Sequence, residues 1–214
     1  MSLNNVLITG SSNGLGYHLS LYFSKKGHNI LLHGRDEKKL KQTQDEIKKY
    51  GVKVKYFVAD LEKDEDIKDL CKYAKKDNIQ ILINNAGILC PNLAFHNFSN
   101  DTINSMLKVN LLAPIKILNL LSKNLKHVIN INSMVGLEAK KNRTLYAASK
   151  WGLKGFSDSL KQEKTEYNIL DVYPTNIKTY PEKDNAMDVN FVIKKIYQAM
   201  LDCKKDLILD GRIK

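Results

Sequence analysis

Val6-Leu7-Ile8-Thr9-Gly10-Ser11-Ser12-Asn13-Gly14-Leu15-Gly16 is the stretch that decides the fold of this chain. A short apolar run ends in a glycine-rich turn, which leads into a segment with apolar residues at Leu15, Leu19, Tyr22 and Phe23. The run predicts a buried strand, and the three-to-four spacing after it predicts a helix. A turn with three glycines lets the helix start close against the strand.

The same alternation continues to the end of the 214-residue chain. Six further short apolar runs lie at residues 29–33, 52–58, 79–83, 127–131, 169–173 and 207–209. Helix-length segments separate them; the longest carries Ile103, Leu107, Leu111, Leu118 and Leu121. This pattern predicts one doubly wound α/β domain over residues 1–214, a parallel sheet of about seven strands with helices on both faces.

Composition narrows the function classes. Hydrophobic residues make up 43% and charged residues 27%, as in ordinary globular domains, which argues against a disordered chain. The net charge of +11 comes from lysines that stand among acidic residues, so we expect a solvated surface, with a nucleic-acid site as the alternative. We expect no membrane segment, no metal among the scattered Cys71, Cys90 and Cys203, and a cytoplasmic protein without a signal peptide.

The glycine turn has the form of a phosphate cradle. Backbone approaches a pyrophosphate closely where glycines replace side chains, and the free N–H groups at a helix N-terminus favour an anion. The spacing is Gly-x-x-x-Gly-x-Gly, which differs from the usual Gly-x-Gly-x-x-Gly. A strand-to-helix turn without a ligand is the alternative for the glycines taken alone.

Further polar residues follow later strands. Asn84-Asn85-Ala86-Gly87 comes after residues 79–83, Ser133 comes after residues 127–131, and Asn110 lies within the long helical segment. Ligands of open α/β sheets bind at the carboxyl ends of the strands, where several of these residues are expected to meet.

Tyr146 and Lys150 are one helical turn apart. A nearby ammonium favours the phenolate of a tyrosine, which can then exchange a proton with an alcohol or a carbonyl. Ser133 can donate a hydrogen bond to the same substrate oxygen. Each residue alone is more often structural, but their joint occurrence predicts a catalytic site.

With these motifs, residues 4–179 resemble the short-chain dehydrogenase/reductase family. The resemblance implies a Rossmann fold and an NAD(P)-dependent oxidoreductase of CH–OH and C=O groups. It implies a cofactor site made by the turn, the residues after later strands and the Pro-x-x-x-x-Thr segment: Gly10, Ser11, Ser12, Asn13, Gly14, Leu15, Gly16, Arg35, Asp60, Leu61, Asn85, Ala86, Gly87, Tyr146, Lys150, Pro174, Ile177 and Thr179.

The resemblance also implies a catalytic tetrad of Asn110, Ser133, Tyr146 and Lys150. Tyr146 would be the general acid/base, and Ser133 would orient the substrate oxygen. Lys150 would hold the nicotinamide ribose and lower the pKa of Tyr146. Asn110 would hold a water of a proton relay.

Two departures from the family bear on activity. Thr175 stands where the family has glycine, and we expect its Cβ to crowd the nicotinamide side. The substrate lid, near residues 180–187, is shorter than is common in the family. A catalytically silent dinucleotide-binding regulator or scaffold is therefore the alternative function.

Cofactor choice is expected to depend on the end of the second strand. Gly34 stands where the family carries the acid that selects NAD, and Arg35, which follows it, suits a 2′-phosphate. Asp36 is the expected N-cap of the next helix. The sequence predicts a preference for NADP(H), with NAD(H) as the alternative.

Substrate and assembly are predicted in outline. The expected pocket residues lie in two segments, one near residues 135–137 and one after Gly87, and their apolar character favours a small uncharged carbonyl or alcohol. The second segment supplies Ile88, Leu89, Cys90, Pro91, Leu93 and Phe95. The resemblance implies a homodimer through the helices that carry Asn110 and Tyr146, with a tetramer left open.

Overall fold

The computed structural model describes residues 3–89, 93–163, 165–179 and 186–212. Its centre is a seven-stranded sheet of order β3-β2-β1-β4-β5-β6-β9, in which every pairing is parallel. The strands are β1 (Asn5–Ile8), β2 (Asn29–Gly34), β3 (Val54–Val58), β4 (Ile81–Asn84), β5 (His127–Ile131), β6 (Asn168–Pro174) and β9 (Asp206–Leu209). The predicted doubly wound parallel sheet is confirmed.

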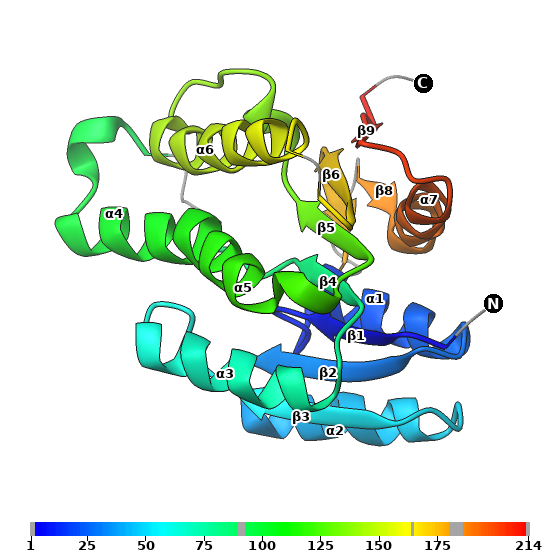
Figure 1. The fold of residues 1–214 in the computed structure, drawn as a ribbon. Coiled ribbons are helices and arrows are strands. Elements are labelled where there is room, and N and C mark those ends of the chain that lie inside the picture. The colour runs from blue at the N-terminus through cyan, green and yellow to red at the C-terminus, as the bar shows by residue number, and fades with distance from the viewer. Residues whose placement is uncertain (1–2, 90–92, 164, 180–185, 213–214) are drawn as a thin grey trace.

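Helices cover both faces of the sheet (Figure 1). One face carries α1 (Gly14–Lys25), α2 (Glu37–Lys48) and α7 (Val189–Leu201). The other carries α3 (Asp64–Lys76), α4 (Asn100–Leu107), α5 (Ala113–Leu121) and α6 (Thr144–Leu160). Short elements complete the fold: β7 (Ile177–Lys178) pairs with β8 (Met187–Asp188), and 3-10 turns lie at Phe95–Asn97, Ser122–Asn124 and Met134–Gly136.

The apolar run of β1 is buried on both sides. Val6 and Ile8 pack into the core formed with α1 and α7, and Leu7 packs into the core formed with α3 and α5. All three side chains are fully buried. Burial of each contributes roughly 1.5–3 kcal/mol, which explains why the run contains no polar residue.

The segment that contains Asn110 is a long helical stretch, residues 100–124, joined through a π-helical turn at Lys108–Leu112. Its 25 residues are apolar enough on average to cross a membrane by length and composition. Ile117, Leu118 and Leu121 pack in the core between the sheet and the helices α3 and α5. Such burial is the ordinary reason for an apolar helix in a globular domain.

Aspartate side chains cap the starts of two helices. The Asp36 side chain accepts a hydrogen bond from the backbone N–H of Lys39 at 3.1 Å, so it is the N-cap of α2 as expected. Asp188 likewise caps α7, with its side chain accepting a hydrogen bond from the backbone N–H of Phe191 at 2.9 Å. Residues 180–185 of the predicted lid lie outside the described residues.

Candidate functional site

Two adjoining hollows lie at the carboxyl ends of the strands. The first, which we call the glycine groove, has a volume of about 670 Å³ and is lined by the glycine turn, the ends of β2 and β3, and the segment after β4. The second, the tyrosine pocket, has a volume of about 510 Å³ and is lined by Ser133, Tyr146 and Lys150. Leu15, Gly87 and Leu89 line both, so the two hollows are continuous.

The glycine turn is built so tightly that side chains are excluded. A Cβ on Gly16 would lie 2.2 Å from the Gly10 carbonyl oxygen and 2.4 Å from Asn85 Nδ2. A Cβ on Gly10 would lie 2.9 Å from Ala86 Cα, and Gly10 has a positive φ of 67°. Helix α1 therefore begins close to the end of β1, with its first N–H groups facing the groove.

Hydrogen bonds from the segment after β4 hold this turn. Asn85 Nδ2 donates to the carbonyl oxygens of Thr9 (2.9 Å) and Gly10 (3.0 Å). Thr9 Oγ1 accepts from the backbone N–H groups of Asn85 and Ala86, both at 3.0 Å. The Asn-Asn-Ala-Gly motif thus supports the turn and lines the groove with it.

His33 is a supporting residue that the sequence analysis did not identify. Its Nδ1 accepts from the backbone N–H of Gly10, and its Nε2 lies 3.2 Å from the Ala59 carbonyl. Burial lowers the pKa of His33 to about 4, so the ring is neutral at physiological pH. A buried neutral histidine in an apolar strand gives no separate sequence signal.

Ser11 corrects one sequence expectation. Its hydroxyl was expected to contact the cofactor, but the residue is fully buried beneath the turn. Ser11 Oγ donates to the His33 carbonyl at 3.2 Å and accepts from the His33 N–H at 2.9 Å. Ser11 therefore fastens the turn to β2 and is absent from the described lining of the groove.

The end of β2 forms a basic corner of the groove. Arg35 lines it, together with Lys39, which the sequence analysis missed because Lys39 stands among other lysines at the start of α2. A Cβ at Gly34 would lie 3.1 Å from Ser12 Oγ, so Ser12 occupies the space of a side chain at position 34. The Asp36 carboxylate caps α2 and is 3.6 Å from Lys39 Nζ.

The remaining predicted cofactor residues divide between the two hollows, except Gly16, which is in the described lining of neither and packs against Gly10 and Asn85. Those lining the glycine groove are Gly10, Ser12, Asn13, Gly14, Leu15, Arg35, Asp60, Leu61, Asn85, Ala86, Gly87 and Thr179. Those lining the tyrosine pocket include Tyr146, Lys150, Pro174, Ile177 and, again, Thr179.

Ser133, Tyr146 and Lys150 meet inside the tyrosine pocket. Ser133 and Tyr146 face the same pocket, and the interaction of their hydroxyls acts to lower the pKa of Tyr146. Lys150 is 5% exposed; its Nζ donates to the Ile131 carbonyl at 2.9 Å and lies 5.7 Å from the centre of the Tyr146 ring. The turn after β5 and the first two turns of α6 place these three groups together.

The protonation of this group differs from the sequence expectation. Burial lowers the pKa of Lys150 from 10.5 to about 8. Burial also raises the pKa of Tyr146, opposed by the hydrogen bond with Ser133 and the positive charge of Arg143. The expected lowering of the Tyr146 pKa by Lys150 is therefore wrong for this structure, because desolvation outweighs the favourable charges.

Asn110 lies outside both hollows as far as their described linings show. It is buried, and its amide pairs with the backbone of Ile88 on both sides: Oδ1 accepts from the N–H at 2.7 Å, and Nδ2 donates to the carbonyl at 3.0 Å. Nδ2 is also 3.3 Å from Ser149 Oγ. The side chain fixes the segment after β4, which lines both hollows, and its expected role in holding a relay water stays a prediction.

Thr175 lies between the tyrosine pocket and the C-terminal segment. Its Oγ1 accepts from the backbone N–H of Gly211 at 2.9 Å and lies 3.4 Å from the Leu209 carbonyl. The hydroxyl is thus engaged by the C-terminal segment, while Thr175 also lines the tyrosine pocket, so the expected crowding of the nicotinamide stays a prediction.

The lining of the tyrosine pocket is more polar than predicted. Ile88 and Leu89 line it, whereas Leu93 and Phe95 are exposed elsewhere, and Cys90 and Pro91 lie outside the described residues. Lys140, Arg143 and Arg212 also line it. Val135 of the expected segment near residues 135–137 lines the pocket as predicted, and the basic residues come from the loop before α6 and from the C-terminal segment.

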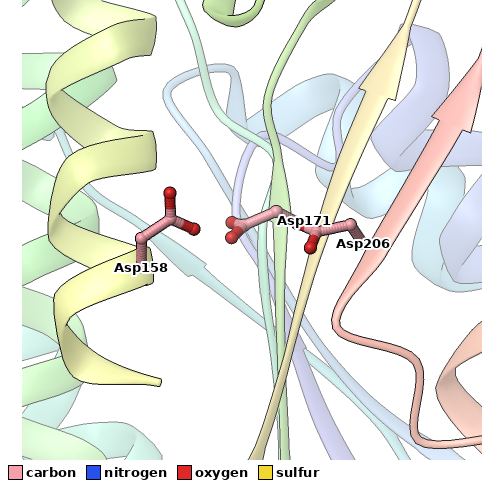
Figure 2. A group of neighbouring side chains, drawn as sticks. All are labelled: Asp158, Asp171 and Asp206. Carbon is pink, nitrogen blue, oxygen red and sulfur yellow. The ribbon is translucent and has the colours of Figure 1, made fainter. Parts of the chain in front are cut away.

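A separate group of carboxylates lies away from these hollows (Figure 2). Asp158 of α6, Asp171 of β6 and Asp206 of β9 have oxygens within 4.8 Å of one another. Lys161 Nζ lies among them, at 2.6 Å from Asp171, 3.0 Å from Asp206 and 3.7 Å from Asp158. A lysine ammonium therefore supplies the positive charge at this cluster.

Comparisons with known proteins agree with this geometry. The profile of the short chain dehydrogenases matches residues 4–189. Nodulation protein G of Rhizobium sp. (strain N33) is 36% identical over 174 residues, which cover 76% of this chain and 68% of that protein. The 3-oxoacyl-acyl-carrier-protein reductase FabG of Buchnera aphidicola is 32% identical over 184 residues, 81% of this chain and 73% of that protein.

A solved structure has the same fold. The bulky-bulky ketone specific alcohol dehydrogenase of Comamonas testosteroni superposes with a TM-score of 0.89 at 25% identity, over 97% of this chain and 86% of that one.

Proposed function

Because the chain belongs to the short-chain dehydrogenase/reductase family, we propose that it transfers a hydride between NADP(H) and a small carbonyl or alcohol substrate, with Tyr146 as general acid/base. The observation that carries this proposal is the meeting of Ser133, Tyr146 and Lys150 at the end of a hollow continuous with the glycine groove. A carbonyl carbon in the pocket then faces both a proton donor and the mouth of the groove.

The residues fit a dinucleotide. Gly10 and Gly14 line the groove where the pyrophosphate would approach, and the start of α1 offers N–H groups there. Gly16 lets α1 start close against the Gly10 carbonyl. When bound, the nicotinamide supplies or accepts the hydride. Arg35 and Lys39 would hold a 2′-phosphate, since both are cations and Asp36 is engaged as a helix cap.

The chain's own groups have distinct tasks in this proposal. Tyr146 gives its proton to the substrate oxygen during reduction and takes it back during oxidation. Ser133 donates a hydrogen bond to that oxygen while charge develops on it. Lys150, with a pKa lowered to about 8, holds the ribose and exchanges a proton near physiological pH. Asn110 acts through Ile88 as a positioning residue.

Assembly and location are part of the proposal. Leu112, in the helical stretch that carries Asn110, and Trp151, in the helix that carries Tyr146, are 41% and 49% exposed. Apolar exposure on these two helices supports a two-fold homodimer. A cytoplasmic location is proposed from the sequence alone.

Tyr146→Phe tests the central assignment. The ring packing stays and the proton donor is lost, so kcat for carbonyl reduction should fall by roughly 10²–10⁴-fold while NADPH still binds. Ser20→Ala is a matched hydroxyl deletion, since Ser20 is buried in α1 away from the site. Near-normal turnover of the Tyr146→Phe protein would contradict the mechanism. Cofactor binding without turnover of any carbonyl by the unaltered protein would favour the silent regulator.

A further inference from the structure

The C-terminal segment returns to the tyrosine pocket after β9 ends. Gly211 and Arg212 line this pocket together with Ser133 and Tyr146. We call residues 209–212 the C-terminal strap. Since β9 is an edge strand, beside β6, the strap reaches the pocket from the side opposite the glycine groove.

Thr175 anchors one end of the strap. The backbone N–H of Thr175 donates to the Leu209 carbonyl at 2.9 Å, and Thr175 Oγ1 accepts from the N–H of Gly211 at 2.9 Å. Gly211 is packed so closely that a Cβ there would lie 2.7 Å from Met187 Cγ. The residue that departs from the family's glycine thus fixes the strap in place.

Arg212 anchors the other end. Its two terminal nitrogens each lie 3.0 Å from a carboxylate oxygen of Glu138, a two-pronged contact. Glu138 belongs to the loop between Ser133 and α6, whose Lys140 and Arg143 line the pocket, so this ion pair joins the strap to a second segment of the pocket wall. Asp210 orients the guanidinium from the strap's own side, with a nearest contact of 2.6 Å.

We call the ion pair between Arg212 and Glu138 the clasp. The charges around it indicate that Arg212 has a structural role and does not bind a ligand. Two carboxylates, Glu138 and Asp210, face Arg212. Both partners of the Arg212–Glu138 pair are nearly half exposed, so the pair adds little to the stability of the whole domain. Its effect is local: it holds two segments together where a substrate must enter.

We propose that the strap is the wall that limits substrate size, with Thr175 and the Arg212–Glu138 clasp holding it against the tyrosine pocket. This rests on the proposed carbonyl reduction. A carbonyl with one small substituent fits beside the strap, and a carbonyl with two bulky substituents needs the clasp to open. Thr175, Glu138 and Arg212 are then specificity-determining residues that need not touch the reacting atoms.

Hydrogen exchange tests the clasp without any substrate. Glu138→Gln removes the charge on the loop, 73 positions before Gly211 in the chain. We expect exchange of the Gly211 amide to rise about two- to fivefold, the factor that an exposed ion pair supplies. Lys141→Gln is the matched control, because Lys141 is an exposed residue of the same loop outside the described pocket lining. Unchanged Gly211 exchange in Glu138→Gln would overturn the clasp.

Kinetics test the consequence. Acetophenone and benzophenone differ by one substituent, methyl or phenyl, on the same carbonyl. We expect Glu138→Gln, Arg212→Gln and Thr175→Val each to raise kcat/KM for benzophenone relative to acetophenone by about two- to fivefold or more, and Lys141→Gln to leave this ratio unchanged. The Glu138→Gln/Arg212→Gln double variant should match Arg212→Gln, because the contact with Glu138 is already lost when Arg212 is replaced.

The two proposals fail separately. Active enzymes with an unchanged ratio in all three variants, or with additive effects in the double variant, would overturn the size-limiting wall and leave the proposed function intact. Failure of the unaltered protein to reduce any carbonyl would contradict the proposed function, and the exchange experiment would still decide whether the clasp exists.

Discussion

Replacement of Lys150 by Met should change how the stability of the protein depends on pH. Lys150 is buried, and its ammonium has one hydrogen bond, to the Ile131 carbonyl, and no carboxylate within ion-pair distance among the described residues. Its pKa is lowered from 10.5 to about 8 by desolvation. This lowering corresponds to roughly 3 kcal/mol, at about 1.4 kcal/mol per pKa unit.

The direction follows from proton binding. The unfolded chain keeps the Lys150 proton up to pH 10.5, whereas the folded protein releases it near pH 8. Between these values the unfolded state binds more protons, so the free energy of unfolding rises with pH. From pH 7 to pH 10, Lys150 should contribute about 2–3 kcal/mol of this rise, and methionine should contribute none.

Urea unfolding of both proteins at pH 7 and pH 10 measures this contribution. Titratable groups that both proteins share contribute equally to the pH dependence of both and cancel in the comparison. Loss of packing, or of the hydrogen bond to Ile131, changes the free energy of unfolding by the same amount at both pH values. Lys141→Met, at an exposed lysine, is the control and should follow the unaltered protein. Equal pH dependence of the Lys150→Met protein and the unaltered protein would refute the reasoning, because Lys150 would then have an ordinary pKa in the folded state.

Three further predictions concern the cofactor, the turn and the assembly. Arg35→Ala should lower the preference for NADPH over NADH, measured as the ratio of kcat/KM values, by roughly tenfold or more, and Lys39→Gln should lower this ratio less. An unchanged ratio in both variants would contradict the proposed binding of the 2′-phosphate by Arg35 and Lys39. Gly16→Ala should abolish NADPH binding and lower the melting temperature, because the new Cβ would collide with Gly10 and Asn85. Gly14→Ala should cost only about 1–2 kcal/mol of backbone strain, because no atom lies within 4 Å of its Cβ. Sedimentation at micromolar concentration should give a homodimer that Leu112→Asp converts to a monomer, and a monomeric unaltered protein would contradict the expected interface.

Much of the fold could be predicted because buried parallel strands leave a strong sequence signal. The run Val6-Leu7-Ile8 must be apolar throughout, since both faces of β1 are covered. The position of the site also follows from the sequence, because strand order brings carboxyl ends to one edge of the sheet. The ends of the strands were predicted less accurately than their presence. The apolar run at residues 79–83 predicted a strand from residue 79, but β4 begins at Ile81, because Ile79 is buried without pairing in the sheet.

Details of the site depended on contacts between distant segments, which periodicity does not encode. Ser11 could not be distinguished from Ser12 by sequence, yet one is buried against His33 and the other lines the groove. The pKa of Tyr146 could not be predicted from Lys150 alone, because burial by the surrounding chain outweighs the neighbouring charges. Thr175 was recognised as unusual, but its partner, Gly211, is 36 residues away.

Helix α6 shows why the site also depends on residues that take no part in chemistry. A helix that packs on a sheet normally presents an apolar stripe, but Tyr146, Lys150, Ser157 and Lys161 recur on one face of α6 at helical spacing. Each of these polar residues except Tyr146 bonds to a specific strand group. Lys150 meets the Ile131 carbonyl, Ser157 meets Asn130 and Asp171, and Lys161 meets Asp171 and Asp206.

The strand partners of α6 form a straight row across the sheet. Asn84, Asn130, Asp171 and Asp206 are register partners on β4, β5, β6 and β9, and Asn84 Nδ2 donates to Asn130 Oδ1 at 2.8 Å. An apolar interface of equal area would hold α6 as firmly, because buried ion pairs recover little more than their desolvation cost. Such an apolar interface would allow the helix to slide along the sheet. In this protein, a shift of α6 by one residue would leave Asp171 and Lys161 as unpaired buried charges. The polar row therefore fixes the position of α6 along the sheet, and with it the distance of Tyr146 from Ser133.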